Sequence, residues 1–141
     1  MMIALKRAYE KPAPSDGKRV LVDRLWPRGI SKDEAKIAEW LKDLAPSNEL
    51  RHWYHERPLM WDAFRQKYLD ELRAPEAAAA LEELEEMALT SRKLTLVYAS
   101  RDEEHNNAVV LKQVLEGTKK PPHKVKREVA PAARQAQAVR R

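Results

Sequence analysis

Two apolar runs separated by a long helical segment constrain the fold of this chain most. They read RVLVDRLW (residues 19–26) and KLTLVYAS (residues 93–100), and an earlier run, IALKRAY (residues 3–9), alternates apolar and basic residues. The two apolar runs are typical of central strands that are covered on both faces. The alternating run is typical of a strand with one exposed face. Parallel strands with helices between them are joined by a right-handed crossover. We therefore expect an α/β fold with a small, mainly parallel sheet covered by helices, in a Rossmann-like three-layer arrangement.

The segment between the two runs begins with capping signals. Ser31 and Glu34 have the spacing of a capping box, which predicts a helix from Lys32. The sequence leaves open whether this helix continues unbroken along the apolar stripe of Ile37, Trp40, Leu41 and Leu44. Ser47 is placed to cap a further short helix, NELRHWYH, over residues 48–55.

Two more helices precede the second apolar run, and one follows it. Pro58 suits the first turn of a helix whose apolar face is Trp61, Phe64, Tyr68 and Leu72. Pro75 opens the next helix, whose inward side is Ala77, Leu81, Leu84 and Ala88. After the second run, Ser100 and Glu103 repeat the capping-box spacing, so we expect the strand to turn directly into a helix. Gly117 is placed to end that helix.

Polar side chains follow both apolar runs. DRLWPRG (residues 23–29) ends the first, and YASRDEEHNN (residues 98–107) ends the second. Ligands of open parallel sheets bind beyond the carboxyl ends of the strands, and the amino terminus of a following helix favours an anion. Arginine supplies a planar fork for carboxylate or phosphate. We therefore predict an anion-binding pocket, with Asp23 and His105 as candidate catalytic residues and with these candidate ligand-binding residues: Arg24, Trp26, Arg28, Ser100, Arg101, Asn106 and Asn107.

A structural interpretation of the same residues stays open. Asp23 and Arg24 are consecutive, so in an extended strand they point to opposite faces and cannot pair with each other. Each then needs its own partner, and breaking a buried pair costs about 3–5 kcal/mol, which is enough to retain both residues without a ligand. Trp26 would cover the core, and His105 would be a solvated side chain rather than a general acid or base. The two asparagines would hydrogen-bond a loop.

Several common kinds of site are not indicated. The sequence has no cysteine, so neither a disulfide nor a thiolate metal site can form. His52, His55 and Glu56 do not have the spacing of an HExxH zinc helix, and no third ligand is evident, so we predict no metal. The three glycines stand apart, and no Walker loop, GxGxxG or GxSxG motif occurs. We therefore predict no bound cofactor.

The positive charge is concentrated at the carboxyl end. Residues 119–141 contain eight Lys or Arg and one Glu, a net charge of +7, which leaves −2 for residues 1–118. We expect one α/β domain over residues 1–117 and a basic, proline-containing, disordered tail over residues 118–141. The tail residues that could contact nucleic-acid phosphates are Lys119, Lys120, Lys124, Lys126 and Arg127. Without a signal peptide or an apolar stretch of membrane-spanning length, a cytoplasmic protein with no membrane partner is expected.

Three segments make the chain similar to a known family. They are SDGKRVLVDRLWPRGISKDEAKIAEWLKDLAPSNELR (residues 15–51), WDAFRQKYLDEL (residues 61–72) and LTLVYASRDEEHNNAVVLKQVL (residues 94–115). Through them the chain, over residues 1–116, resembles the YeaO-like family of uncharacterised bacterial proteins, a branch of a domain family of unknown function. The resemblance implies a compact α/β domain with the two strand-end motifs close together, and it implies no established activity.

The resemblance also bears on the candidate catalytic residues. Longer relatives in this family have a similar Asp-x-Arg strand end, and Asp23 corresponds to their aspartate by its position in the motif. They have a Cys-His-Arg motif after the later strand, which in the short branch usually reads Asn-His-Ala. Here it reads Asn106-Asn107-Ala108. The missing histidine weakens any mechanism built on an imidazole at this position, unless His105 substitutes for it.

Three classes of function fit these observations. The first is an anion-binding domain or a small enzyme acting on a phosphorylated or carboxylated metabolite. In it, Arg24 and Arg28 would bind charge, and Asp23 would orient an arginine or act as a base, assisted by His105 or Ser100. The second is a nucleic-acid-associated protein or regulator that uses the basic tail, although no helix-turn-helix is recognisable in the body of the chain. The third is a protein-interaction module that uses exposed helix faces. The sequence does not indicate an oligomeric state.

Overall fold

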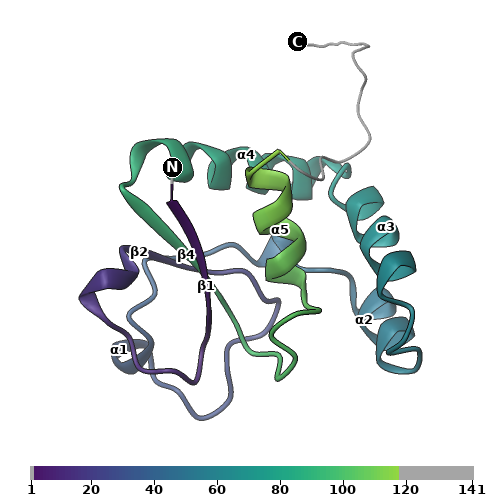
Figure 1. Ribbon diagram of the computed structural model, residues 1–141, viewed down its shortest axis with the longest axis horizontal. Helices are drawn as coiled ribbons and strands as arrows, with labels where there is room; N and C mark the ends of the chain where they lie inside the picture. Colours follow the sequence, from purple (N-terminus) through teal and green to yellow (C-terminus); the bar gives the residue numbers. More distant parts are fainter. Residues whose placement is uncertain (1, 118–141) are drawn as a thin grey trace.

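The structure, a computed structural model, describes residues 2–117, which are built on one four-stranded sheet (Figure 1). The strands lie in the order β1-β4-β2-β3, and every pair is parallel. Their bounds are β1 Met2–Arg7, β2 Lys18–Leu21, β3 Glu39–Trp40 and β4 Lys93–Tyr98. The α-helices of the described chain are α1 Lys32–Ala35, α2 Asn48–His55, α3 Trp61–Glu71, α4 Pro75–Thr90 and α5 Asn107–Leu115, with short 3-10 helices at Pro14–Asp16 and Lys42–Leu44. The predicted α/β class with a small parallel sheet is confirmed.

Strand β4 is central because it pairs with both β1 and β2. Leu96 of β4 is opposite Leu5 of β1 and Val20 of β2. Successive strand residues point to opposite faces of a sheet. Leu96 therefore enters the main core, while its neighbour Val97 packs with Leu21 on the other face. Both faces of the two central strands carry buried apolar groups, as their unbroken apolar sequences predicted.

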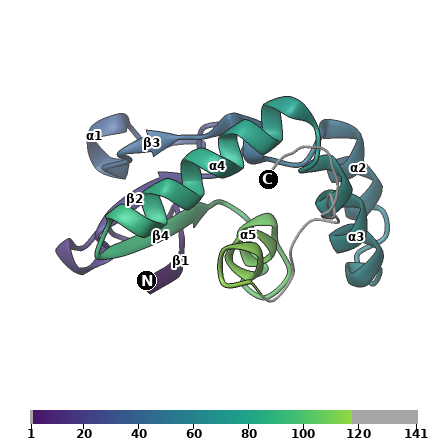
Figure 2. The same ribbon diagram turned by 90° about the horizontal axis from the view of Figure 1, so that it is seen from above.

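The two faces of the sheet have different covers (Figures 1 and 2). Helices α4 and α5 pack on one face, where Leu84 of α4 and Leu111 of α5 are fully buried in the main core. The other face is covered by the segments around α1 through a small cluster in which Trp26, Ile30, Ile37 and Trp40 pack on Ala8, Leu21 and Val97. Helices α2 and α3 lie side by side at one end of the molecule, with α5 between them and β1.

The apolar stripe at residues 37–44 belongs to an edge strand and a 3-10 helix, not to a continued helix. Helix α1 is only four residues long, because Lys36 takes the left-handed conformation with a φ of 52°. Leu41 N then donates to Leu21 O at 3.0 Å, next to the two-residue pairing that adds β3 to the sheet. In this arrangement Trp40 is packed against the small cluster. The stripe is therefore buried by long-range strand pairing, which helical periodicity cannot reveal.

The last helix also begins later than the sequence predicted. Helix α5 starts at Asn107 rather than directly after Ser100. Asn106 is the cap, because its Oδ1 accepts from Val109 N at 3.0 Å. The second capping-box spacing forms a loop instead, in which Ser100 Oγ accepts from Asp102 N at 3.2 Å.

Of three further signals for helix starts, two are confirmed and one is wrong. Ser47 caps α2, and Pro75 is the first residue of α4, as predicted. Pro58 was placed wrongly in the first turn of α3, which begins three residues later. It lies in a preceding turn that is closed by a hydrogen bond from Met60 N to Arg57 O at 2.9 Å.

The described residues do not include the carboxyl-terminal segment. The predictions of a disordered basic tail over residues 118–141 and of nucleic-acid contacts from it lie outside the described range. A single domain over residues 1–117 stays the prediction for the rest of the chain. Within residues 2–117, no helix has both the length and the apolar character that crossing a membrane requires.

Candidate functional site

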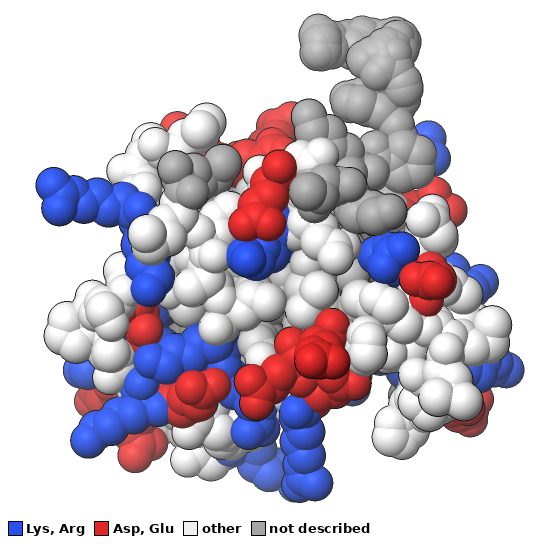
Figure 3. Space-filling model, in the orientation of Figure 1, with Lys and Arg blue, Asp and Glu red and all other residues white. Residues whose placement is uncertain are grey.

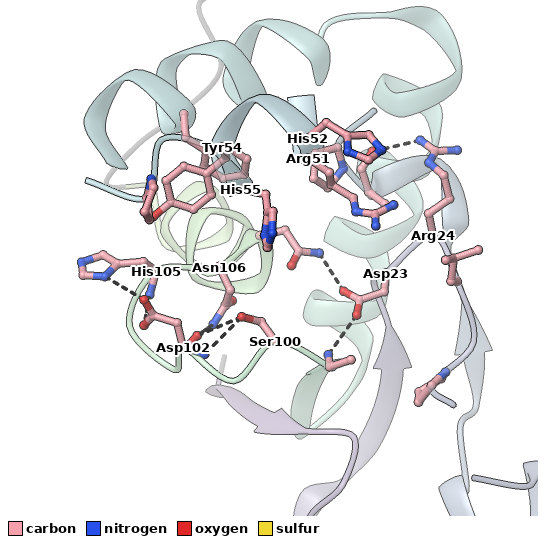
Figure 4. A pocket seen from close by; sticks show the side chains of 18 of the residues that line it. Asp23, Arg24, Arg51, His52, Tyr54, His55, Ser100, Asp102, His105 and Asn106 are labelled. Atoms are coloured by element: carbon pink, nitrogen blue, oxygen red, sulfur yellow. Dashed lines mark hydrogen bonds and ion pairs between the residues drawn. The ribbon is translucent and has the colours of Figure 1, made fainter. Parts of the chain in front are cut away.

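A cleft of about 840 Å³ opens at the carboxyl ends of β2 and β4 (Figure 4). Its lining comes mainly from residues 23–28 after β2, from residues 99–107 after β4 and from helix α2. The parallel pairing of β2 with β4 puts the two strand ends side by side. Among the nine candidate residues, Arg101 is exposed and is not part of the lining; the other eight line the cleft, namely Asp23, Arg24, Trp26, Arg28, Ser100, His105, Asn106 and Asn107.

Asp23 joins the two strand ends. Its Oδ2 accepts a hydrogen bond from Ala99 N at 2.9 Å, and its Oδ1 accepts one from Asn107 Nδ2 at 3.1 Å. The same Asn107 amide donates to Val22 O at 3.0 Å. Burial raises the pKa of the Asp23 carboxyl above its ordinary value, although the bonds from Asn107 and Ala99 and the charge of Arg51 act in the opposite direction. Asp23 is therefore a bridge between β2, β4 and α5 that is held by neutral donors.

Arg24 does not pair with Asp23, as expected for consecutive residues. Its Nη2 donates to Ala45 O at 3.2 Å, and its Nε is buried without a hydrogen-bond partner in the described chain. Arg28 is exposed, and its backbone oxygen accepts from Tyr9 Oη at 3.1 Å. Its guanidinium group makes no hydrogen bond or ion pair with residues 2–117. The guanidinium group of Arg28 and the Nη1 of Arg24 therefore have no hydrogen-bond partner among residues 2–117.

Trp26 covers the small cluster on the second face and also lines the cleft. Its ring lies edge-on to that of Trp40, with centroids 5.3 Å apart and an interplanar angle of 67°. Its Nε1 donates to Ile30 O. Trp40 Nε1 in turn donates to Asp23 O at 2.7 Å, so the two indoles fix the chain that follows β2. These contacts fit the interpretation of Trp26 as a core cover.

The loop after β4 is organised by Asp102. Its Oδ1 accepts from Glu104 N at 2.9 Å and from His105 N at 3.0 Å, and its Oδ2 lies 3.2 Å from His105 Nδ1. The bond from Glu104 N is the main cause of a lowered pKa at the Asp102 carboxyl. The half-exposed His105 ring also lies against Trp61 of α3, with centroids 5.0 Å apart. His105 therefore lies in the loop before α5. The predicted helix directly after Ser100, which would have included His105, is wrong at this position.

Asn106 closes the amino terminus of α5. Besides accepting from Val109 N, it donates through Nδ2 to Asp102 O at 2.8 Å. Its side chain is buried. The helix terminus that the sequence suggested for an anion is therefore partly satisfied by the chain itself.

Helix α2 forms a wall of the cleft that the sequence analysis missed. Arg51, His52 and His55 line the cleft from this helix (Figure 4), because residues three and four apart share a helix face. The helix is anchored by its cap, since Ser47 Oγ donates to Glu71 Oε2 of α3 at 2.6 Å. The two histidines had been compared only with a zinc-binding pattern, so their shared face with an arginine was overlooked.

The sequence did contain one usable signal for this wall. In the helix over residues 48–55, Leu50 is buried and Trp53 and Tyr54 pack against the main core. Its cationic side must therefore face away from the core. That this side faces the strand ends depends on how α2 packs on α3, where the ring of Tyr54 stacks on that of Phe64. Such packing cannot be read from local periodicity.

The lining is richer in cationic than in anionic groups. The titratable groups in it include three arginines, three histidines and two aspartates: Arg24, Arg28, Arg51, His52, His55, His105, Asp23 and Asp102. Both aspartates already accept hydrogen bonds from their own chain. Among the described residues, no group of His, Cys, Asp or Glu side chains is arranged to hold a metal ion. The cleft can therefore offer positive charge and hydrogen-bond donors to a ligand.

Comparisons with known proteins agree on one family. A family model described as the inactive DUF488-N3 subclade matches residues 2–133. An uncharacterised protein of Mycobacterium tuberculosis (strain H37Rv) is 47% identical over 116 residues, which cover 82% of this chain and 94% of that protein. The uncharacterised protein YeaO of Escherichia coli (strain K12) is 42% identical over 113 residues, which cover 79% of this chain and 94% of that protein. No solved structure gives a significant match. The chain therefore belongs to the DUF488 family and groups with its YeaO-like members.

Proposed function

We propose that this domain binds a small anion, such as the phosphate or carboxylate group of a metabolite, in the cleft at the strand ends. The supporting observation is an imbalance between donors and acceptors in the lining. Asp23 and Asp102 accept hydrogen bonds from their own chain. The guanidinium group of Arg28 has no partner within residues 2–117, and that of Arg24 makes one hydrogen bond there, from Nη2 to Ala45 O. Cationic donors without partners favour an anionic ligand.

Arg51 adds a second source of charge from a different wall. It is exposed, and its Nη1 donates to Asn48 Oδ1 at 2.9 Å, which leaves its other donors available. It is also close enough to Asp23 to influence the pKa of that carboxyl. An anion between Arg51 and Arg24 would receive planar donor groups from α2 and from the end of β2.

The proposal is for binding without chemical conversion. The contacts of Asp23 give it a structural role, because its two carboxylate oxygens accept from Ala99 N and Asn107 Nδ2 and so join the strand ends. His105 is engaged by Asp102 and by the ring of Trp61. By the family resemblance, Asn107 also stands at the position where the short branch usually has histidine. The description of the matching family model as an inactive subclade agrees with this proposal.

Nucleic-acid binding through the basic tail stays a prediction, because residues 119–127 lie outside the described part of the chain. The described domain gives no further support to the prediction of nucleic-acid binding. On the face drawn in Figure 3, Lys and Arg side chains are interspersed with Asp and Glu, in keeping with the net charge of −2 for residues 1–118. A surface of mixed sign attracts a polyanion less than a basic patch would.

Titration with inorganic phosphate tests the proposal. At a concentration about 100 times its dissociation constant, phosphate is expected to stabilise the wild-type protein by about 2.7 kcal/mol, seen as a higher melting temperature. Arg51→Gln is expected to weaken phosphate binding about tenfold, because a charge-assisted donor is lost. The matched control is Arg92→Gln, which removes the same charge from an exposed position outside the lining. Absence of stabilisation by phosphate, or equal losses in the two variants, would contradict the proposal.

A further inference from the structure

The cleft has an aromatic side as well as a cationic side. Figure 4 shows Arg24, Arg51 and His52 at one side of the cleft, with Tyr54 and His105 at the other. All five residues line the same cleft. A ligand that reaches both sides must therefore have two chemically different parts.

The aromatic side is a row of rings that is fixed before any ligand binds. Tyr54 stacks on Phe64, with centroids 4.5 Å apart and an interplanar angle of 26°. Phe64 lies 5.6 Å from Trp61, and Trp61 lies 5.0 Å from His105, both measured between ring centroids. Phe64 is buried, whereas Tyr54 and His105 are partly exposed. Tyr54, Phe64 and His105 line the cleft, and Trp61 packs behind them. The rings hold one another in place, so a ligand ring could pack there with little ordering cost.

Tyr54 also offers a polar group beside its ring. Its hydroxyl makes no hydrogen bond to residues 2–117. Burial and the negative charge of Asp102 raise the pKa of this hydroxyl above its ordinary value, which is already well above neutral pH, so the hydroxyl is protonated. A protonated phenol is a hydrogen-bond donor, and it suits the nitrogen or carbonyl oxygen of a heteroaromatic ring.

The size of the cleft also exceeds what an inorganic anion needs. At about 840 Å³, it is within the range of about 300–1,000 Å³ that is usual for sites of drug-sized ligands. We infer that the ligand is a phosphomonoester that carries a planar aromatic or heteroaromatic ring. Its phosphate binds to Arg24, Arg51 and His52, and its ring packs against Tyr54 and His105. This inference rests on the proposed anion binding and adds the second part of the ligand.

Four probes separate the two parts of the ligand. Inorganic phosphate, ribose 5-phosphate, phenyl phosphate and adenosine 5′-monophosphate are titrated calorimetrically at one pH and one ionic strength, with adenosine as the control that lacks a phosphate. The two ring-bearing phosphates are expected to bind about tenfold more tightly than ribose 5-phosphate, because a stacked ring contributes a factor of that order. A further preference for the nucleotide over phenyl phosphate would identify a nucleotide as the source of the ring, and equal affinity would identify an aryl phosphate.

A pair of Tyr54 variants tests the role of the ring. Tyr54→Leu is expected to abolish the preference for ring-bearing phosphates while leaving the affinity for inorganic phosphate unchanged. Tyr54→Phe keeps the ring and is expected to keep the preference for phenyl phosphate. Arg51→Gln should instead weaken all four probes by the same factor. Thermal melting of each variant without ligand shows whether it folds. If Tyr54→Leu does not fold, the affinities of the wild-type protein for the four probes still test whether the ligand carries a ring.

The possible failures are distinguishable. Equal affinity of the wild-type protein for the nucleotide and for ribose 5-phosphate would overturn the ring-bearing ligand and leave the anion site intact. Binding of adenosine as tightly as of its monophosphate would overturn the placement of the phosphate on the cationic side. Binding of none of the phosphates would overturn the anion site and this inference with it.

Discussion

Two aspartates at opposite edges of the sheet have opposite electrostatic surroundings. Asp16 precedes β2 and accepts hydrogen bonds from Lys6 Nζ at 3.0 Å and from Arg19 Nη1 at 2.8 Å. Asp23 follows β2 and accepts from one backbone amide and one side-chain amide. Neither Arg24, its neighbour in the chain, nor Arg51, whose charge acts on it, forms an ion pair with Asp23 in the described chain.

The comparison shows which charges the fold uses. Burial acts to raise the pKa of the Asp16 carboxyl, but hydrogen bonds from Ala13 N, Lys6 and Arg19 hold it below its ordinary value. Burial prevails at Asp23, and its pKa is raised. At the amino edge of the sheet, basic side chains are neutralised by a buried carboxylate. At the carboxyl edge, the basic side chains are not neutralised by a carboxylate of the described chain. An anionic ligand could therefore neutralise them.

The largest effect is expected from removing the carboxylate at the amino edge. Asp16→Ala leaves the guanidinium group of Arg19 buried, with 4% of its surface exposed, and without its charged partner. The free energy of unfolding should fall by about 3–5 kcal/mol. Urea denaturation followed by tryptophan fluorescence measures the loss.

A double variant is the control for this prediction. In Asp16→Ala combined with Arg19→Met, the buried guanidinium group is gone, and Lys6, which also loses its partner, is partly exposed. Part of the lost stability should therefore return. A single variant that loses less than about 1 kcal/mol, or a double variant less stable than the single one, would show that the amino edge is not held by its ion pair.

A smaller loss is expected from disconnecting the carboxyl edge. Asn107→Leu conserves much of the side-chain volume but removes the donor that reaches both Asp23 Oδ1 and Val22 O. An unsatisfied buried acceptor costs about 1–3 kcal/mol, so this variant should be more stable than Asp16→Ala. The same urea denaturation measures it. Gln66→Leu, an exposed change on α3, is the matched control and should stay within about 0.5 kcal/mol of wild type. If Asn107→Leu and Gln66→Leu lost the same free energy of unfolding, the inference that Asn107 joins the strand ends would be contradicted.

The parts of the fold that the sequence predicted well are those set by neighbours in the chain. The cap at Ser47 and the proline at Pro75 mark the starts of α2 and α4 correctly. The two central strands were evident from apolar runs, and their parallel pairing followed from the helical segment between them. The shared cleft at their carboxyl ends then needed only the topology rule for open parallel sheets.

The parts that were missed depend on contacts between distant residues. The stripe containing Trp40 looked helical because its spacing is helical, yet its burial comes from pairing with β2. Asn107 bonds to residues that are 84 and 85 positions away in the chain. The contribution of Arg51 to the cleft depends on the packing of α2 against α3. No local pattern encodes these distances, which is why the motif residues were found and their partners were not.

The smallest effect is expected in the pH dependence of stability, where the two aspartates should have opposite signs. The pKa of Asp16 is lowered from 3.8 on folding, so its stabilisation is complete above 3.8 and is lost as the pH falls through the folded pKa. The pKa of Asp23 is raised from 3.8, so its stabilisation is complete below 3.8 and is lost as the pH rises through the folded pKa.

Asp16→Asn and Asp23→Asn isolate these two contributions, because each variant removes one titrating group and keeps its shape. The wild-type advantage over Asp16→Asn should grow as the pH rises through the acid range up to about 4. The advantage over Asp23→Asn should shrink as the pH rises above 3.8. If both differences changed in the same direction, the carboxylate at Asp23 would be neutralised by cations just as Asp16 is. Arg24 and Arg51 would then already have their anion within the fold, and the cleft would have no excess charge to offer a ligand.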